Sequence, residues 1–260
     1  MEEDFDFDGV FDDDYLYFYA DRLDEEHSEQ DTAFIAGLLG LEPRMRVLDV
    51  PCGHGRIANR LAVRGAEVVG VDSNPLFLER ARQDAAARGV EVDFLQGDMR
   101  DLPGLGRDDV GRDGDGRFDA VVNWFTSFGY FDDATDRSIL SGFRRALRSG
   151  GRLVMDLLNR DLLLLSQGRA WSGAVFVVEQ GDDLMIDRVH LDAAATRSHT
   201  ERIVVRGGRV RRTRFSVRLF TLSELRGWLR DAGFGEVEAY TGSGTPFTWG
   251  ADRLVVLAIA

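Results

Sequence analysis

The segment from Arg46 to Arg56 constrains the fold of this chain more than any other part of it. It reads Arg-Val-Leu-Asp-Val-Pro-Cys-Gly-His-Gly-Arg: a hydrophobic strand, a carboxylate at the strand's end, a glycine turn and the start of a helix. A second hydrophobic run, Glu67–Asp72, follows and also ends in a carboxylate. Strands that alternate with helices in this way predict a parallel sheet with a ligand at the carboxyl ends of its strands.

The acids near the glycine turn indicate what kind of ligand to expect. Residues 53–58 fit the dinucleotide pattern G-x-G-x-x-A, in which glycines let the backbone approach the ligand and an acid after the next strand, here Asp72, binds ribose hydroxyls. Asp49 would repel a pyrophosphate at the helix N-terminus. A sulfonium cofactor with an α-amino group carries positive charge there instead, so Asp49 favours S-adenosylmethionine over NAD. Capping of the glycine turn is the structural alternative for Asp49.

Further strands extend the pattern. The third predicted strand, Val92–Gln96, is followed by a glycine, Asp98 and Met99. In a nucleoside site, a carboxylate here can accept a hydrogen bond from the adenine amino group, and the apolar side chain beside it can cover the ring. The fourth strand spans 118–125, and a fifth follows a predicted glycine turn at 149–151.

With these residues in view, the chain resembles the class I S-adenosylmethionine-dependent methyltransferases over roughly residues 15–260. Pro-Cys-Gly-His-Gly-Arg at 51–56 and Ser-Phe-Gly-Tyr-Phe at 127–131 are similar to a bacterial small-molecule branch, which includes N- and O-methyltransferases of natural-product pathways. The chain departs from the family at Ser149, where Pro usually precedes Gly-Gly, and at residues 103–117. We interpret this longer loop as a mobile surface insertion.

The resemblance implies an α/β fold: a Rossmann-like, seven-stranded, mostly parallel sheet with helices on both faces. It implies S-adenosyl-L-methionine as cofactor, S-adenosyl-L-homocysteine as product, and a small molecule of secondary metabolism that is methylated on nitrogen or oxygen. Two alternatives stay open: a methyltransferase acting on RNA or protein through a basic insertion, and a non-catalytic cofactor-binding protein. An NAD oxidoreductase is a more distant alternative.

The pattern divides the chain into four parts. Residues 1–20 form an acidic, aromatic arm and lid, and residues 21–170 form the cofactor-binding core. Residues 171–220 form an antiparallel insertion after the fifth strand, which the resemblance places over the cofactor's methyl group as a substrate roof. Residues 221–260 provide a helix and the closing strands of the core. The arm should be disordered unless it docks through its phenylalanines, Phe5, Phe7 and Phe11.

The insertion is predicted from a change of periodicity after Leu165. Runs with the character of strands are joined by turns, and Gly207-Gly208 fits a tight hairpin. The predicted strands are 175–178, 184–191, 202–205 and 210–219.

Composition restricts the partners. The net charge of −13 argues against nucleic acid, because phosphate binding needs a positive field. A single cysteine fits the reducing cytoplasm, and no hydrophobic run is long enough to cross a membrane. No Cys/His spacing for a metal is present. We therefore expect a small-molecule acceptor and no nucleic acid, membrane or metal partner, while a homodimer is possible.

Methyl transfer is an in-line displacement at carbon, for which an enzyme aligns the nucleophile, excludes water and removes a proton where required. Shape should therefore matter more than a catalytic triad. The predicted catalytic residues are Tyr15, Tyr17 and Tyr130, because aromatic rings can close over a sulfonium and a hydroxyl can orient the acceptor. A hydrophobic anchor for the arm is the alternative role of the arm tyrosines.

The predicted cofactor-binding residues are Tyr19, Asp49, Gly53, Gly55, Asp72, Ser73, Asp98, Met99 and Asn123. The predicted substrate-binding residues are Phe125, Phe128, His190 and Arg218. Core packing is an alternative for Phe128 and the favoured role of Trp124 and Phe131. For His54 the resemblance suggests a structural or cofactor-edge role.

The segment 202–218 is basic within an acidic protein. A solvated strand face that balances the acidic arm is the simpler interpretation, and an arginine fork for an anionic substrate is the sharper one. The resemblance places Arg218 beside the pocket, and Arg253 is a weaker candidate. For His190, an exposed position on the sheet surface is the simpler interpretation.

Overall fold

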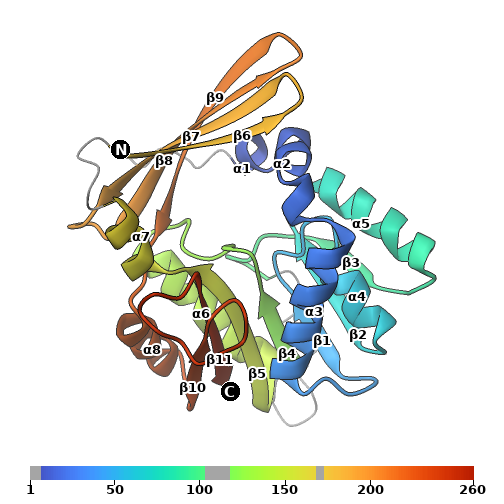
Figure 1. The fold of residues 1–260 in the computed structure, drawn as a ribbon. Helices are drawn as coiled ribbons and strands as arrows, with labels where there is room; N and C mark the ends of the chain where they lie inside the picture. The colour runs from blue at the N-terminus through green and yellow to red at the C-terminus, as the bar shows by residue number, and fades with distance from the viewer. Residues whose placement is uncertain (1–6, 103–117, 168–172) are drawn as a thin grey trace.

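The structure is a computed structural model that describes residues 7–102, 118–167 and 173–260. The predicted loop insertion at 103–117 and Phe5 lie outside the described residues. Two sheets organise the chain (Figure 1). The larger one has the strand order β10-β11-β5-β4-β1-β2-β3, and its neighbours from β3 to β5 run parallel. The predicted α/β fold with a seven-stranded, mostly parallel sheet is confirmed.

The strands of this sheet are β1 (Arg46–Asp49), β2 (Glu67–Asp72), β3 (Asp93–Gln96), β4 (Phe118–Asn123), β5 (Leu147–Leu158), β10 (Val237–Tyr240) and β11 (Arg253–Ile259). The last two close the sheet antiparallel to β5, as predicted. The predicted glycine turn at 149–151 is wrong, because these residues lie within β5. The register shifts there, since Phe118 pairs with Leu147 but Ala120 pairs with Arg152, so the glycines form a bulge inside the strand.

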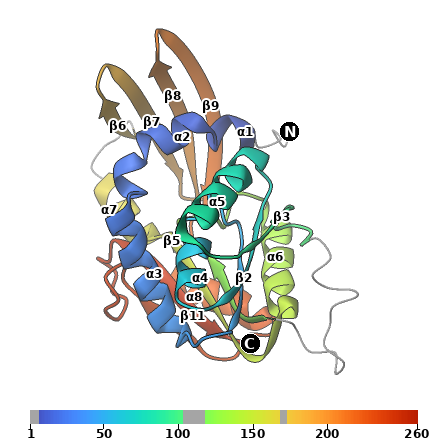
Figure 2. The ribbon, with the colours of Figure 1, turned by 90° about the vertical axis from the view of Figure 1, so that its right-hand side faces the viewer.

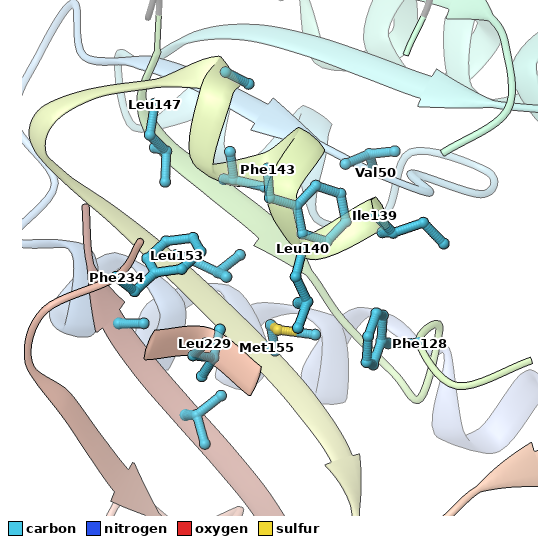
Figure 3. Packing of buried hydrophobic residues seen from close by; sticks show 14 of the residues in the cluster. Val50, Phe128, Ile139, Leu140, Phe143, Leu147, Leu153, Met155, Leu229 and Phe234 are labelled. Atoms are coloured by element: carbon cyan, nitrogen blue, oxygen red, sulfur yellow. The ribbon is translucent and has the colours of Figure 1, made fainter. Parts of the chain in front are cut away.

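Helices cover both faces of the larger sheet (Figure 1). One face packs against α3 (Glu25–Leu39), α4 (Ala58–Val63) and α5 (Pro75–Arg88), and the other packs against α6 (Asp133–Ala146) and α8 (Leu222–Asp231). The alternation of side chains in β1 decides which layer each residue enters, because Val47 joins the first layer and Leu48 the second. Figure 3 shows the second layer, where Ile139, Leu140 and Phe143 of α6 pack over the sheet.

Local sequence signals set the helix ends. The Asn74 side chain accepts hydrogen bonds from the backbone N–H groups of Leu76 and Phe77 and so caps α5, with Pro75 in its first turn. Thr221 caps α8 in the same way through the N–H of Glu224. A further short helix, α7 (Arg160–Gln167), follows β5.

The second sheet is antiparallel, in the order β6 (Ala174–Gln180), β7 (Asp183–Asp192), β8 (Arg197–Arg206) and β9 (Arg209–Arg218). Gly207 and Gly208 join β8 to β9 with φ values of 55° and 74°, so the predicted tight hairpin is confirmed. The strand β8 begins five residues before the predicted start at Arg202, because its polar first half pairs with both neighbours.

The N-terminal arm contains α1 (Phe7–Val10), α2 (Asp13–Phe18) and a short 3₁₀ helix, η1 (Ala20–Arg22). Figures 1 and 2 both place α1 and α2 between the second sheet and α5. The arm contacts the second sheet at β6 and β9. The arm is therefore docked on the second sheet. The sequence predicted an ordered arm only if it docked.

Candidate functional site

A cavity lies at the carboxyl ends of the core strands, beneath the N-terminal arm. It holds about 1060 Å³ of space free of protein atoms, its open mouth included. The core lines it with the residues that follow β1 to β4, and the arm lines it with the rings of Phe7, Phe11 and Tyr15. Ligands of parallel α/β sheets bind at this edge, so this cavity is the candidate functional site.

Asp72 ends β2 and shapes the glycine turn beside it. Its carboxylate is 8% exposed and accepts hydrogen bonds from the backbone N–H groups of Gly53 (2.7 Å) and Asn74 (2.9 Å). Gly53 has a φ of 55°, a conformation that favours glycine. Burial raises the pKa of Asp72, and the N–H donors oppose this rise. Because a carboxylate has about four lone-pair positions, Asp72 keeps accepting capacity for a ligand.

Asp49 ends β1 and is 2% exposed. Burial raises the pKa of its carboxyl group to about 8, the charge of Asp72 adds to the rise, and the positive charge of Arg56 opposes it. The carboxyl group is therefore mostly protonated at neutral pH until a cation arrives. Removal of its proton would then place a buried negative charge next to that cation.

Asp98 lies at the cavity's edge after β3. Its carboxylate pairs with Arg100, with 2.6 Å between Nη2 and Oδ2. Partial burial raises the pKa of Asp98, but the hydrogen bonds from Arg100 outweigh this effect and hold it below its usual value. Asp98 therefore stays ionised, and Met99 beside it lines the cavity and packs on the core.

The backbone after β4 is strained where it meets the cavity. Phe125 and Thr126 have φ values of 63° and 57°, which residues other than glycine rarely adopt. The Asp156 carboxylate accepts the Phe125 N–H (3.1 Å), and the Asp156 carbonyl accepts the Thr126 N–H (3.0 Å). Arg253 pairs with the same carboxylate at 2.7 Å. This buried support turns the Phe125 ring toward the cavity.

Aromatic rings close the cavity from the side of the arm. The Phe7 ring lies 5.4 Å from Phe131 between centroids, and Phe11 lies 5.8 Å from Tyr130 and 5.3 Å from Tyr15. Burial raises the pKa of Tyr15 and of Tyr130 above the usual value for tyrosine. Both phenols therefore stay protonated at neutral pH and can donate hydrogen bonds but cannot serve as bases.

Polar contacts hold the arm in place. The Asn74 side chain donates to the Phe11 carbonyl at 2.8 Å, which ties the arm to the start of α5. Arg211 of β9 pairs with Asp12 (2.6 Å) and Asp14 (2.7 Å). Part of the basic segment thus balances the acidic arm, which agrees with the simpler interpretation of its sequence.

Two titratable groups of the glycine loop also line the cavity. Burial lowers the pKa of His54 to about 4, so its ring is neutral at pH 7 and binds protons weakly. The Cys52 side chain is 6% exposed, and burial raises the pKa of its thiol well above the usual value. Neither group is activated for acid–base or nucleophilic chemistry.

Within residues 7–102, 118–167 and 173–260, no group of three potential metal ligands occurs. No helix in these ranges has the length and apolar character that a bilayer crossing requires.

A known family matches a segment of the chain that contributes to this cavity. Residues 47–151, which contain the glycine turn and the acids Asp49, Asp72 and Asp98, match the family described as a methyltransferase domain. This segment of the chain is similar to a methyltransferase domain. The sequence resemblance to class I methyltransferases is thereby confirmed.

Known methyltransferases share parts of this chain. A demethylmenaquinone methyltransferase of Thermus thermophilus is 42% identical over 112 residues, which cover 42% of this chain and 46% of the relative. The match thus spans less than half the length of this curated relative. The activity and substrate of that protein are therefore not transferred from this match alone.

Solved methyltransferase structures share the whole fold. CcbJ of Streptomyces caelestis has a TM-score of 0.72 at 24% identity, covering 91% of this chain and 96% of that one. CalS10, an amino pentose methyltransferase of Micromonospora echinaspora solved with S-adenosylmethionine, has a TM-score of 0.64 at 23% identity, covering 94% and 96%. At these identities the likeness shows the fold. The S-adenosylmethionine bound in CalS10 is the cofactor that the sequence of this chain predicts.

The structure places nine of the predicted site residues in the lining of this cavity: Tyr15, Asp49, Gly53, Asp72, Ser73, Asp98, Met99, Phe125 and Tyr130. Their roles toward cofactor and acceptor stay predictions. Seven others lie outside the lining: Tyr17, Tyr19, Gly55, Asn123, Phe128, His190 and Arg218.

Phe128 belongs to the hydrophobic core, and Arg218 is held by ion pairs within the chain. Phe128 is 1% exposed and stacks on Phe220, with 5.6 Å between ring centroids. Arg218 pairs with Asp133 (3.1 Å) and with Glu224, so the end of β9 lies beside the first turns of α6 and α8. These ion pairs give Arg218 a structural role, and its role in binding an anionic substrate stays a prediction.

Tyr17 and Tyr19 bind the second sheet. The Tyr17 hydroxyl donates to the Gln180 carbonyl at 3.1 Å. The Tyr19 hydroxyl accepts from Arg202 at 3.0 Å, and its ring lies behind Tyr15 with 4.8 Å between centroids. These contacts support the anchor role for both residues.

The remaining three predicted site residues are Gly55, Asn123 and His190. The first two have structural roles, and the third lies on the surface. A Cβ at Gly55 would lie 2.8 Å from the Cβ of Ala81, so this glycine permits close helix packing. The Asn123 amide is buried and donates to the Val50 carbonyl at 2.8 Å. His190 is exposed on β7, as the simpler interpretation held.

Sequence reasoning missed several lining residues. Trp124 and Phe131 line the cavity although core packing was favoured for both, and Phe77 and Ser127 were not considered. Arg56 also lines it. Its position next to Gly55 was a signal, since the residue after a glycine turn lies at the ligand edge.

Proposed function

We propose that this chain transfers a methyl group from S-adenosylmethionine to the nitrogen of a small-molecule amine. The observation that carries the proposal is the convergence of Asp49, Asp72 and Asp98 on one cavity at three successive strand ends. When bound, the cofactor supplies an activated methyl group on a sulfonium.

The residues fit an adenosyl cofactor. Asp72 has free accepting positions for ribose hydroxyls, and Asp98 with Met99 can meet the adenine amino group and ring. Asp49 is a buried carboxyl group whose burial favours a cationic partner, which the ammonium of the amino-acid end provides. The glycine turn at Gly53 lets the backbone come close.

The acceptor side of the cavity favours nitrogen over oxygen. A hydroxyl acceptor must lose its proton, yet the described lining offers no suitable base besides the carboxylates that face the cofactor. His54 has a pKa of about 4, and the pKa values of Tyr15 and Tyr130 are raised. An amine carries its own lone pair once it has lost its proton to solvent. Aromatic faces such as those of Tyr15 and Phe125 also attract amines in their cationic form.

The likeness to CalS10 supports an amino sugar as one acceptor class and a natural-product setting, since that protein methylates an amino pentose. The antiparallel sheet, which lies over the arm, is the proposed roof of the acceptor site. A homodimer and a cytoplasmic location stay predictions.

The alternative of an RNA acceptor loses its main support. Arginines of the basic segment are bound to carboxylates of the chain itself: Arg202 to Asp187 at 2.7 Å, Arg206 to Asp14 at 2.8 Å and Arg211 to Asp12 at 2.6 Å. These side chains are neutralised internally, so they offer little field to a phosphate backbone.

The test is a transfer assay with methyl-labelled S-adenosylmethionine and matched acceptor pairs, each an amino sugar and its hydroxyl analogue. The proposal expects label on the nitrogen of the amines and none on the hydroxyl analogues, with transfer lost in Asp72→Ala. Label found only on oxygen would overturn the choice of nitrogen. Cofactor binding without transfer to any small molecule would favour a non-catalytic cofactor-binding protein.

A further inference from the structure

The two edge strands of the second sheet, β6 and β9, differ in how they are protected (Figure 2). β9 carries arginines along its length and contacts α1 of the arm. β6 has β7 as its only neighbour among the described strands. Its residues 174–178 are all apolar, and Val175, Phe176 and Val177 are 60%, 50% and 51% exposed. An edge strand with exposed apolar side chains and unpaired backbone groups is a site at which another strand can pair.

β6 also lacks the features by which proteins usually block pairing at an edge. Residues 174–178 contain no charge and no proline, and their pairing with β7 runs without a register shift. The arm bonds to β6 at Gln180, its last residue, where the Tyr17 hydroxyl donates to the Gln180 carbonyl and the Gln180 side chain donates to the Tyr17 carbonyl (3.2 Å). The described part of the chain therefore leaves the apolar edge of β6 open.

The sequence of β6 is self-complementary when the strand pairs with a second copy of itself. In an antiparallel pair centred on Phe176, a twofold axis places Val175 of each copy opposite Val177 of the other. Because side chains alternate between the two faces of a strand, the Phe176 rings of the two copies adjoin on one face and the valines on the other. Aromatic pairs across antiparallel strands are stabilising, and burial of the valines removes apolar surface from water.

The distribution of charge favours the same pairing. The net charge of −13 opposes association of two copies in general, so a contact between them needs an uncharged surface. Residues 174–178 supply one. The register centred on Phe176 also places Glu179 opposite Gly173 of the other copy, so no like charges face each other in the pair.

We infer that two copies of this chain associate through β6 and form one antiparallel sheet that continues across a twofold axis. The interface lies next to the anchor of the arm, because Tyr17 binds Gln180 at the end of the same strand. A second copy on β6 would therefore steady the strand on which the arm docks. The inference concerns the second sheet alone and does not depend on the proposed function.

The test is analytical ultracentrifugation of the whole chain over a wide range of concentrations. The wild type should approach twice the monomer mass as the concentration rises. Phe176→Lys places two ammonium groups together at the twofold axis, so association should weaken about 10- to 100-fold. The matched control is Val210→Lys on the other edge strand, β9, where the valine is 63% exposed, and it should leave association unchanged.

A charge swap tests the register. Val175→Lys alone should weaken association, because the lysine faces the valine of the other copy. Val175→Lys combined with Val177→Glu places a lysine opposite a glutamate twice and should restore most of the association. Residues 175–177 and Val210 are half exposed or more, so all variants should keep the thermal unfolding of the wild type.

Each contrary outcome overturns a stated part of the inference. A wild type that stays monomeric at every concentration would overturn the second copy as the occupant of β6 and leave this edge to a different partner. A dimer that Phe176→Lys and Val175→Lys leave intact would overturn the role of β6. Loss of the dimer in Val175→Lys without recovery in the double variant would overturn the register centred on Phe176.

Discussion

The protonation of Asp49 gives a sharp prediction about cofactor binding. Burial raises the pKa of this carboxyl group to about 8. At pH 6.5 it is therefore protonated in about 97% of free molecules. A bound ammonium favours the carboxylate and should return its pKa toward the usual value of about 4, so binding should release about one proton.

The ionisation of Asp49 also sets the dependence of cofactor affinity on pH. Only the ionised carboxylate meets the ammonium well, so affinity should rise up to about tenfold per pH unit from pH 6 to 7.5. At pH 6.5 it should be about 30-fold below the value for a fully ionised site. Asp49→Asn cannot ionise, so its affinity should be low and nearly flat across this range.

The assay is calorimetric titration with S-adenosylhomocysteine at pH 6.5 in buffers of different ionisation enthalpy. The ligand's α-amino group, with a usual pKa of about 7.7–8.0, is already protonated at this pH and adds little proton exchange. The wild type should release close to one proton and Asp49→Asn close to none. Equal proton release by the two proteins would refute the pairing of Asp49 with the ammonium.

Three further predictions concern other parts of the chain. Tyr15→Phe should keep cofactor affinity but slow transfer about tenfold if the hydroxyl orients the acceptor; equal turnover would leave Tyr15 as packing. Asp136→Asn should raise the free energy of unfolding at pH 8 by about 2–4 kcal/mol, because burial raises the pKa of this carboxyl group to about 7 and its ionised form is therefore unfavourable in the fold. The gain should vanish at about pH 3, where the acid is largely protonated in both states, and denaturant unfolding at the two pH values measures it; an equal gain at both would contradict this cause. Arg211→Met should loosen the arm, seen as faster hydrogen exchange in residues 7–18 at low salt, and high salt should reproduce part of this effect in the wild type; unchanged exchange would mean that apolar docking alone holds the arm.

The acids of the site could be predicted from the sequence because topology alone brings them together. Asp49 and Asp72 are the last residues of neighbouring parallel strands, and Asp98 follows the next strand by two residues. Parallel strands end at one edge of the sheet, so no side-chain detail was needed. The glycine at 53 followed from the same pattern.

The acceptor side could not be predicted in the same way, because the chain after β4 does not continue the alternation of a strand. The positive φ values of Phe125 and Thr126 reverse the backbone and turn Phe128 into the core. Support for that turn comes from Asp156 and Arg253, which are distant in sequence.

The arginines of the second sheet show a further limit. Alternation predicts which face of a strand a residue occupies, but the partners of Arg218 come from α6 and α8. Only the packing of β9 against α6 and α8 decides whether such an arginine meets a substrate or an acid of the chain.

The most direct test of the account is a titration of the wild-type chain with S-adenosylhomocysteine near pH 8, with NAD as the comparison ligand. The wild type should bind S-adenosylhomocysteine saturably and should not bind NAD, and Asp72→Ala should bind S-adenosylhomocysteine much more weakly. Absence of binding by the folded wild type, or binding that Asp72→Ala leaves intact, would contradict it.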